Sequence, residues 1–90
     1  MREVLMSTEY ERLVILLRSE RLKVGMRQVD LARKVRLSQQ AISAIENLRT
    51  ATDIDQVRRI CNALGIDMVE LVREWLDAVE PKRRKKRSSK

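Results

Sequence analysis

Residues 25–46 read GMRQVDLARKVRLSQQAISAIE, and this stretch decides the fold. Its apolar residues recur at helical spacing in two short runs. The first run is Leu31, Ala32 and Val35, and the second is Ile42 and Ile45. The helices that carry these runs are separated only by residues 36–38, and Ser38 is a favourable N-cap for the second helix. The stretch therefore predicts two helices, over residues 27–35 and 39–47, joined by a tight turn as in a helix-turn-helix unit.

Three further helices are predicted outside this unit, over residues 8–24, 54–64 and 68–80. Their expected caps are Ser7 or Thr8, Asp53 and Asp67, and their expected stops are Gly25, Gly65 and Pro81. The expected fold is all-α, a compact five-helix bundle. It comprises a flexible N-terminus over residues 1–7, one domain over residues 8–80 and a disordered basic tail over residues 81–90.

The composition excludes most catalytic and metal chemistry. The 90 residues contain no histidine and a single cysteine, so neither an intrachain disulfide nor a thiolate metal cluster can form. Cys61 lies at helical spacing from Val57 and Leu64, which indicates a buried structural thiol. We expect no enzyme activity, no metal and no cofactor. No apolar run has the ~20 residues of a membrane span, and residues 1–7 lack the apolar stretch and cleavage site of a signal peptide, so a cytoplasmic location is expected.

Positive charge is concentrated in two parts of the chain. The net charge is +7, and the tail PKRRKKRSSK holds seven of the 20 basic residues, which leaves a body with 13 basic and 13 acidic residues. Within that body, residues 1–50 carry +4 and residues 51–81 carry −4. The basic part surrounds the predicted helix-turn-helix, so a polyanion is the expected partner. The tail either binds DNA or only raises solubility.

The motifs of residues 25–72 resemble those of the Cro/C1-type (XRE family) helix-turn-helix domains of phage repressors and bacterial transcriptional regulators. The run GMRQVDLARKVRLSQQAISAIE is similar to the family pattern G-L-(S/T)-Q-x-x-L-A-x-x-x-G-(V/L)-S-x-x-x-I-S-x-I-E, and the later helices continue the pattern through ALGI at residues 63–66. The resemblance covers about residues 10–76. It implies a lambda-repressor-like fold in which the second and third helices form the helix-turn-helix.

The resemblance also implies functional positions. The base-reading positions are Gln39, Gln40, Ser43 and Ala44. The positions for contact with the DNA backbone are Arg27, Gln28, Arg36, Ser38, Asn47, Arg49 and Thr50. Gln28 is further expected to brace the third helix, and Arg18 and Glu46 are expected to form a structural ion pair between the first and third helices. Glutamine suits base reading because its amide can pair in a bidentate way with adenine N6 and N7.

Three residues depart from the family pattern. Arg36 and Leu48 stand where glycine is usual, and Arg27 replaces the serine or threonine that usually caps the second helix. If Arg36 keeps a left-handed conformation, the cost is about 1 kcal/mol. Otherwise the turn has another shape, and the angle of the recognition helix changes. In either case Arg27 and Arg36 are expected to add positive charge near the phosphates.

The last predicted helix carries an apolar stripe that is longer than a small domain needs. The stripe consists of Met68, Leu71, Val72, Trp75, Leu76 and Val79. Its first three members are expected in the core, whereas Trp75, Leu76 and Val79 either complete the core or form a two-fold dimer contact.

The expected function is sequence-specific binding of double-stranded DNA by a transcriptional regulator, a repressor acting as a homodimer on a palindromic operator. The protein is expected to be encoded by a bacterium or a phage and to be associated with the nucleoid, with no membrane as a partner. One alternative is the antitoxin of a toxin–antitoxin pair with autoregulatory DNA binding. Another is a protein-interaction module that has lost base reading; no protein partner is identified by the sequence. RNA binding is disfavoured because Tyr10 and Trp75, the two aromatic residues, lie away from the basic cluster.

Overall fold

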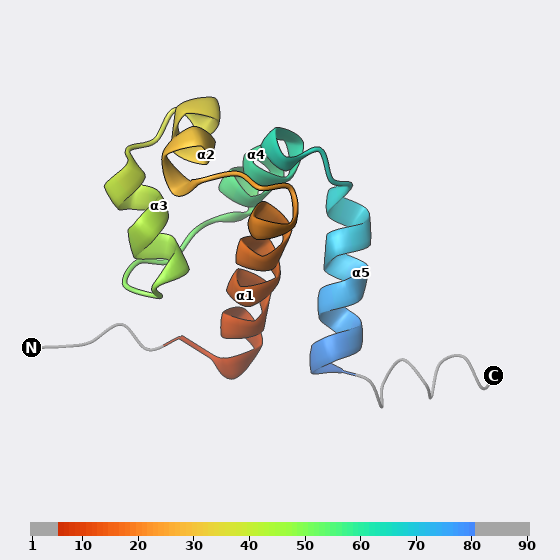
Figure 1. Cartoon of the computed structure of the whole chain (residues 1–90). Coiled ribbons are helices and arrows are strands. Elements are labelled where there is room, and N and C mark those ends of the chain that lie inside the picture. Colours follow the sequence, from red (N-terminus) through yellow and green to blue (C-terminus); the bar gives the residue numbers. More distant parts are fainter. Residues whose placement is uncertain (1–5, 81–90) are drawn as a thin grey trace, which may run out of the picture.

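The computed structural model describes residues 6–80, and this part of the chain contains five helices and no strand (Figure 1). The helices are α1 (Thr8–Lys23), α2 (Gln28–Val35), α3 (Gln39–Glu46), α4 (Ile54–Leu64) and α5 (Met68–Val79). The all-α five-helix fold predicted from the sequence is confirmed. The expectations of a flexible start and a basic tail concern residues that lie largely outside the described range, at 1–5 and 81–90.

Short polar side chains begin four of the five helices. Ser7, Ser38, Asp53 and Asp67 each accept a hydrogen bond from a backbone N–H in the first turn of the helix that follows. Such a bond satisfies one of the four N–H groups that have no partner within a helix. The predicted ends of α1, α3 and α5 differ from the observed ends by one residue, because Val24, Asn47 and Glu80 are C-caps rather than helical residues.

The core is aliphatic and is built from all five helices. Its buried members include Leu17, Leu31, Val35, Ile42, Val57, Ile60, Leu64 and Leu71. Cys61 is fully buried among them, and burial raises the pKa of its thiol. The predicted structural role of this cysteine agrees with its position.

Helices α1 and α5 lie side by side and run in opposite directions (Figure 1). Near the start of α1, the indole Nε1 of Trp75 donates a hydrogen bond to the backbone oxygen of Glu9 at 2.7 Å. At the next residue of α1, the Tyr10 hydroxyl accepts from the backbone N–H of Thr52 at 3.0 Å. The two aromatic residues thus fix the first turn of α1 to α5 and to the loop before α4.

None of the helices within residues 6–80 combines the length and the apolar character that crossing a bilayer requires.

Candidate nucleic-acid interface

Helices α2 and α3 form a helix-turn-helix whose turn is closed by Arg36. This residue has φ 61° and ψ 43°, the left-handed conformation, and it allows Leu37 N–H to donate to Ala32 O at 2.9 Å. Such a bond is typical of a helix that ends in a left-handed residue. Arg36 therefore keeps the conformation of the family glycine, and of the two alternatives for this turn the strained one is observed.

A second left-handed residue follows the other end of α3. Leu48 has φ 61°, and Arg49 N–H donates to Ala44 O at 2.8 Å. Left-handed conformation costs a residue with a Cβ roughly 1 kcal/mol. Helix α3 is thus held between two turns that each store strain at a position where glycine would relieve it. The two side chains differ in their surroundings, because Arg36 is exposed and Leu48 is half-buried beside α1.

A buried ion pair joins α1 to the last turn of α3, and its cation is Arg21. The Glu46 carboxylate accepts from Arg21 Nε at 2.7 Å and from Arg21 Nη2 at 2.9 Å, with 6% and 8% of the two side chains exposed. The remaining Nη1 donates to Met26 O at 2.7 Å, which fixes the turn between α1 and α2. A bidentate arginine–carboxylate pair is the strong form of this interaction.

The prediction that Arg18 is the partner of Glu46 is therefore only partly correct. The Nε of Arg18 lies 3.7 Å from Glu46 Oε1, but 56% of its side chain is exposed, so it is the outer and weaker partner. Arg18 and Arg21 lie almost one turn apart on α1, and both can extend toward α3. Arg21 was missed because an arginine between Glu20 and Leu22 carries no local signal that marks it as buried.

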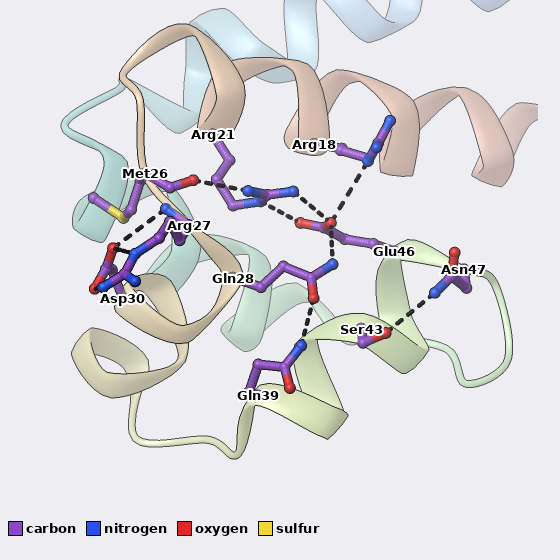
Figure 2. A network of polar contacts seen from close by, with 10 residues as sticks. All are labelled: Arg18, Arg21, Met26, Arg27, Gln28, Asp30, Gln39, Ser43, Glu46 and Asn47. Atoms are coloured by element: carbon purple, nitrogen blue, oxygen red, sulfur yellow. Dashed lines mark hydrogen bonds and ion pairs between the residues drawn. The ribbon is translucent and has the colours of Figure 1, made fainter.

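A chain of side-chain hydrogen bonds leads from this buried pair to the start of α3 (Figure 2). The Nε2 of Gln28 donates to Glu46 Oε1 at 2.9 Å, and the Nε2 of Gln39 donates to Gln28 Oε1 at 2.7 Å. An ionised carboxylate only accepts, so Gln28 must turn its NH₂ to Glu46 and its oxygen to Gln39. Gln39 must then turn its NH₂ to Gln28. Its own oxygen and one N–H stay available for other partners.

The positions expected to read bases differ in solvent exposure and in their hydrogen bonds. Gln39 and Gln40 are exposed in the first turn of α3, whereas Ser43 and Ala44 are half-buried. The hydroxyl of Ser43 also accepts from Asn47 Nδ2 at 3.2 Å. The two glutamines are therefore the more accessible pair, and Ser43 is shared with Asn47.

The positions expected to meet phosphates lie at both ends of α3. Ser38 uses its hydroxyl to cap the helix, accepting from Ala41 N–H at 3.0 Å. Arg49 and Thr50 are exposed on the loop after α3, where the backbone N–H groups of both bind Ala44 O. The guanidinium of Arg49 has no acidic partner within residues 6–80. It is thus available to a phosphate.

Arg27 is less available for contact with a phosphate than its position beside α2 indicates. The residue is the N-cap of α2, and Asp30 accepts from its backbone N–H at 3.4 Å and from its guanidinium at 2.9 Å and 3.0 Å. These hydrogen bonds lower the pKa of Asp30 and raise the pKa of Arg27. Asp30 thus makes only the reciprocal contact of a capping box, to the N–H of the N-cap residue, and the Arg27 side chain does not accept from the first turn of α2 as a serine or threonine would. Asp30 also offsets the charge that Arg27 brings.

The candidate dimer residues occupy two environments on α5. Trp75 is half-buried and bound to Glu9, so it belongs largely to the contact between α5 and α1. Leu76 is 38% exposed, and Val69 near the start of the helix is 62% exposed. Val79 is half-buried at the end of the helix. An apolar stripe on α5 thus remains partly uncovered in the single chain.

Within the described residues, no group of histidine, cysteine, aspartate and glutamate side chains is placed to hold a metal ion.

Comparison with known families identifies this arrangement of helices. The helix-turn-helix family model matches residues 17–71, more than half of the chain, and the chain therefore belongs to the helix-turn-helix family. The resemblance predicted from the sequence is confirmed. Among curated protein sequences, none shows significant similarity to the chain.

Solved structures extend the comparison beyond the matched residues. The wild-type restriction-modification controller protein C.Esp1396I superposes with a TM-score of 0.75 at 26% identity, covering 82% of this chain and 96% of that one. The C.Esp1396I tetramer in complex with its natural 35 base-pair operator gives 0.73 at 26% identity, covering 80% and 95%. The clp gene regulator ClgR from C. glutamicum gives 0.71 at 26% identity, covering 81% and 95%.

Proposed function

We propose that this protein is a transcriptional regulator that binds double-stranded DNA in a sequence-specific manner, as a repressor dimer on a near-palindromic operator. The observation that carries the proposal is the hydrogen-bond chain from Glu46 through Gln28 to Gln39. It holds an amide in one orientation at the start of α3, the helix that enters the major groove in helix-turn-helix complexes. The similar controller protein C.Esp1396I has been crystallised with operator DNA, which supports the same role here.

The orientation of the Gln39 amide favours adenine. Adenine presents N7 as an acceptor and N6–H₂ as a donor in the major groove. The free oxygen of Gln39 can accept from N6, and the N–H that is not bound to Gln28 can donate to N7. Both contacts form without breaking the bond to Gln28.

Backbone contacts are proposed for both ends of α3. Ser38, Asn47, Arg49 and Thr50 lie at these ends, Gln28 lies beside Gln39, and Arg36 lies in the turn. Phosphate contacts of this kind fix the register of a protein on DNA but carry no sequence information. Arg27 contributes less to them because Asp30 already binds its guanidinium.

A dimer through α5 accounts for the uncovered apolar stripe. A two-fold contact would cover Leu76 and its neighbours and would place two copies of α3 on paired half-sites. Sedimentation equilibrium of wild type and Leu76→Glu tests this contact. Ile54→Glu on α4 is the control, because it makes the same change of charge at an apolar residue that is 74% exposed. A dimer lost in the first variant and kept in the control supports the contact, and an unchanged dimer contradicts it.

Fluorescence anisotropy tests the function itself. The full chain is titrated with labelled genomic and random duplexes at one fixed salt concentration, because affinity for DNA depends steeply on salt. A regulator binds some duplexes much more tightly than the random pool, by a factor on the order of 10³ or more. Equally weak binding to every duplex would instead favour a module that has lost base reading. A cytoplasmic location, with the nucleoid as the site of action, is part of the same proposal.

A further inference from the structure

A hollow lies between α2 and α4, and every charged side chain that lines it is a cation. Its lining residues are Lys34, Val35, Arg36, Arg59, Asn62 and Ala63. We infer that this hollow binds the phosphodiester backbone of DNA outside the bases that α3 reads. The inference rests on the proposed function and adds to it a second region of DNA contact, centred on Lys34 and Arg59, for which the resemblance to the family implies no role.

The cations of α2, its C-cap and α4 form two groups, those with an acidic partner and those without one. Arg33 on α2 pairs with Asp30 at 3.7 Å, and Arg58 on α4 pairs with Asp55 at 2.7 Å. In contrast, the three cations that line the hollow have no acidic partner within residues 6–80. The acids of α2 and α4 therefore lie where they neutralise the neighbouring arginines and leave the hollow positive.

Local helix electrostatics explains only part of this arrangement. Lys34 and Arg36 lie at the C-terminal end of α2, where the helix dipole favours a cation. Arg59 lies in the middle of α4, away from either end, and is half-buried. Bringing it beside two like charges raises the electrostatic energy of the free protein. An anion in the hollow would lower that energy and would bind all three side chains.

The form of the hollow indicates which anion it takes. No aromatic ring lines it, so it offers no surface on which a base could stack, and its walls are mostly polar and open to solvent. Arginine forks suit phosphate oxygens in a bidentate way. Arg36 lines the hollow and also belongs to the turn that leads directly into α3, the helix that presents Gln39. A phosphate strand of DNA satisfies all of these features, and the link through Arg36 to the base-reading helix favours it over an acidic protein segment.

Paired variants on the same two helices test the inference. Lys34→Gln/Arg59→Gln removes two charges from the hollow, and Arg33→Gln/Arg58→Gln removes two charges beside it. Affinity is measured against salt on a duplex that ends at the selected site and on one extended by about one helical turn at each end. On the extended duplex the hollow variant is expected to lose about 1.8 of the slope of log K against log salt for each bound subunit, and about 3.6 for a dimer, because each phosphate contact contributes about 0.9. The control variant should keep the wild-type slope.

The duplex length identifies the source of the phosphates. A loss confined to the extended duplex assigns them to the flanks of the bound site. An equal loss on both duplexes, with two duplexes in each complex, assigns them to a second duplex and still supports phosphate binding. The single variant Lys34→Gln, at an exposed position, should lose about 0.9 of the slope for each bound subunit and gives the same answer if the double variant is unstable.

Two results would overturn the inference. A hollow variant with the wild-type slope on both duplexes would show that no phosphate binds there, while sequence discrimination by the wild type would leave the proposed function intact. A variant that keeps its DNA slope but loses binding to labelled poly-glutamate would assign the hollow to an acidic protein. If the wild type itself fails to discriminate sequences, the proposed function fails first.

Discussion

The side-chain nitrogen of Gln39 donates to the side-chain oxygen of Gln28 across 2.7 Å, and this bond joins the first turns of α3 and α2. It is the outer end of a chain of contacts that begins at the buried carboxylate of Glu46. Because the carboxylate can only accept, it sets the direction of every amide that follows it. A buried acid at the end of α3 thereby determines which atoms the beginning of α3 presents to a partner.

Removing the outer amide should affect recognition and leave the fold intact. In Gln39→Ala, discrimination at one base pair is expected to fall by about 1–3 kcal/mol, because one bidentate contact is lost. Gln39 is exposed and contributes no core packing, so the midpoint of urea unfolding should stay close to wild type. Anisotropy against duplexes with each base pair substituted in turn provides the measurement. A uniform loss of affinity on all of them would assign Gln39 to the backbone.

Neutralising the inner acid should affect both stability and recognition. Glu46→Gln keeps the size of the side chain but leaves Arg21 buried without its counter-charge, which typically costs about 3–5 kcal/mol. The amide introduced by this substitution could also turn its NH₂ toward Gln28 and release the fixed orientation of the chain of hydrogen bonds. Asp55→Asn removes the acid of an exposed pair with Arg58 and is the matched control. Its free energy of unfolding should change by less than about 1 kcal/mol. Equal effects of the two variants would contradict a special role for Glu46.

The strained turn can be relieved by a single substitution. Arg36→Gly should raise the free energy of unfolding by about 1 kcal/mol, because glycine adopts the left-handed conformation without a Cβ penalty. The same variant should bind DNA more weakly and with a smaller salt slope, because a phosphate contact is lost. Arg36→Ala removes the charge but keeps the Cβ, so it should lose affinity without gaining stability. Chemical denaturation and anisotropy of both variants separate strain from charge.

The position of Ile45 gives a test of the core that does not involve DNA. Ile45→Ala should lower the free energy of unfolding by about 2–5 kcal/mol, because a nearly fully buried side chain is removed from the base of α3. Ile54→Ala makes the same substitution at a residue that is 74% exposed, so it should change stability by less than about 0.5 kcal/mol. A small effect of Ile45→Ala would mean that α3 is not anchored through this residue.

Much of the fold could be predicted from local chemistry. The expected N-caps are observed at Ser38, Asp53 and Asp67. A short polar side chain just before an apolar run can accept from the backbone N–H groups of the first helical turn, so its role can be predicted locally. Gly65 ends α4 in the left-handed conformation for a similarly local reason. The helix-turn-helix could be predicted because apolar residues recur at helical spacing on both sides of the short turn at residues 36–38.

The candidate site could be predicted only in part, because its contacts join distant residues. Gln28 and Glu46 are 18 positions apart, and no local pattern indicates that they meet. The choice of Arg21 over Arg18 depends on how α1 is rotated about its axis against α3, which spacing alone does not fix. The hollow between α2 and α4 was not predicted, because its cations come from two helices whose facing sides are known only in three dimensions.

Selection of bound duplexes from a random pool tests the central claim most directly. The full chain is incubated with the pool, the retained duplexes are sequenced, and the enriched motif is read for symmetry, spacing and base preference. Two inverted half-sites whose centres lie about one helical turn apart are predicted, with an adenine preferred at the position that Gln39 reads and lost in the Gln39→Ala selection. A pool that stays random after repeated rounds would contradict the account.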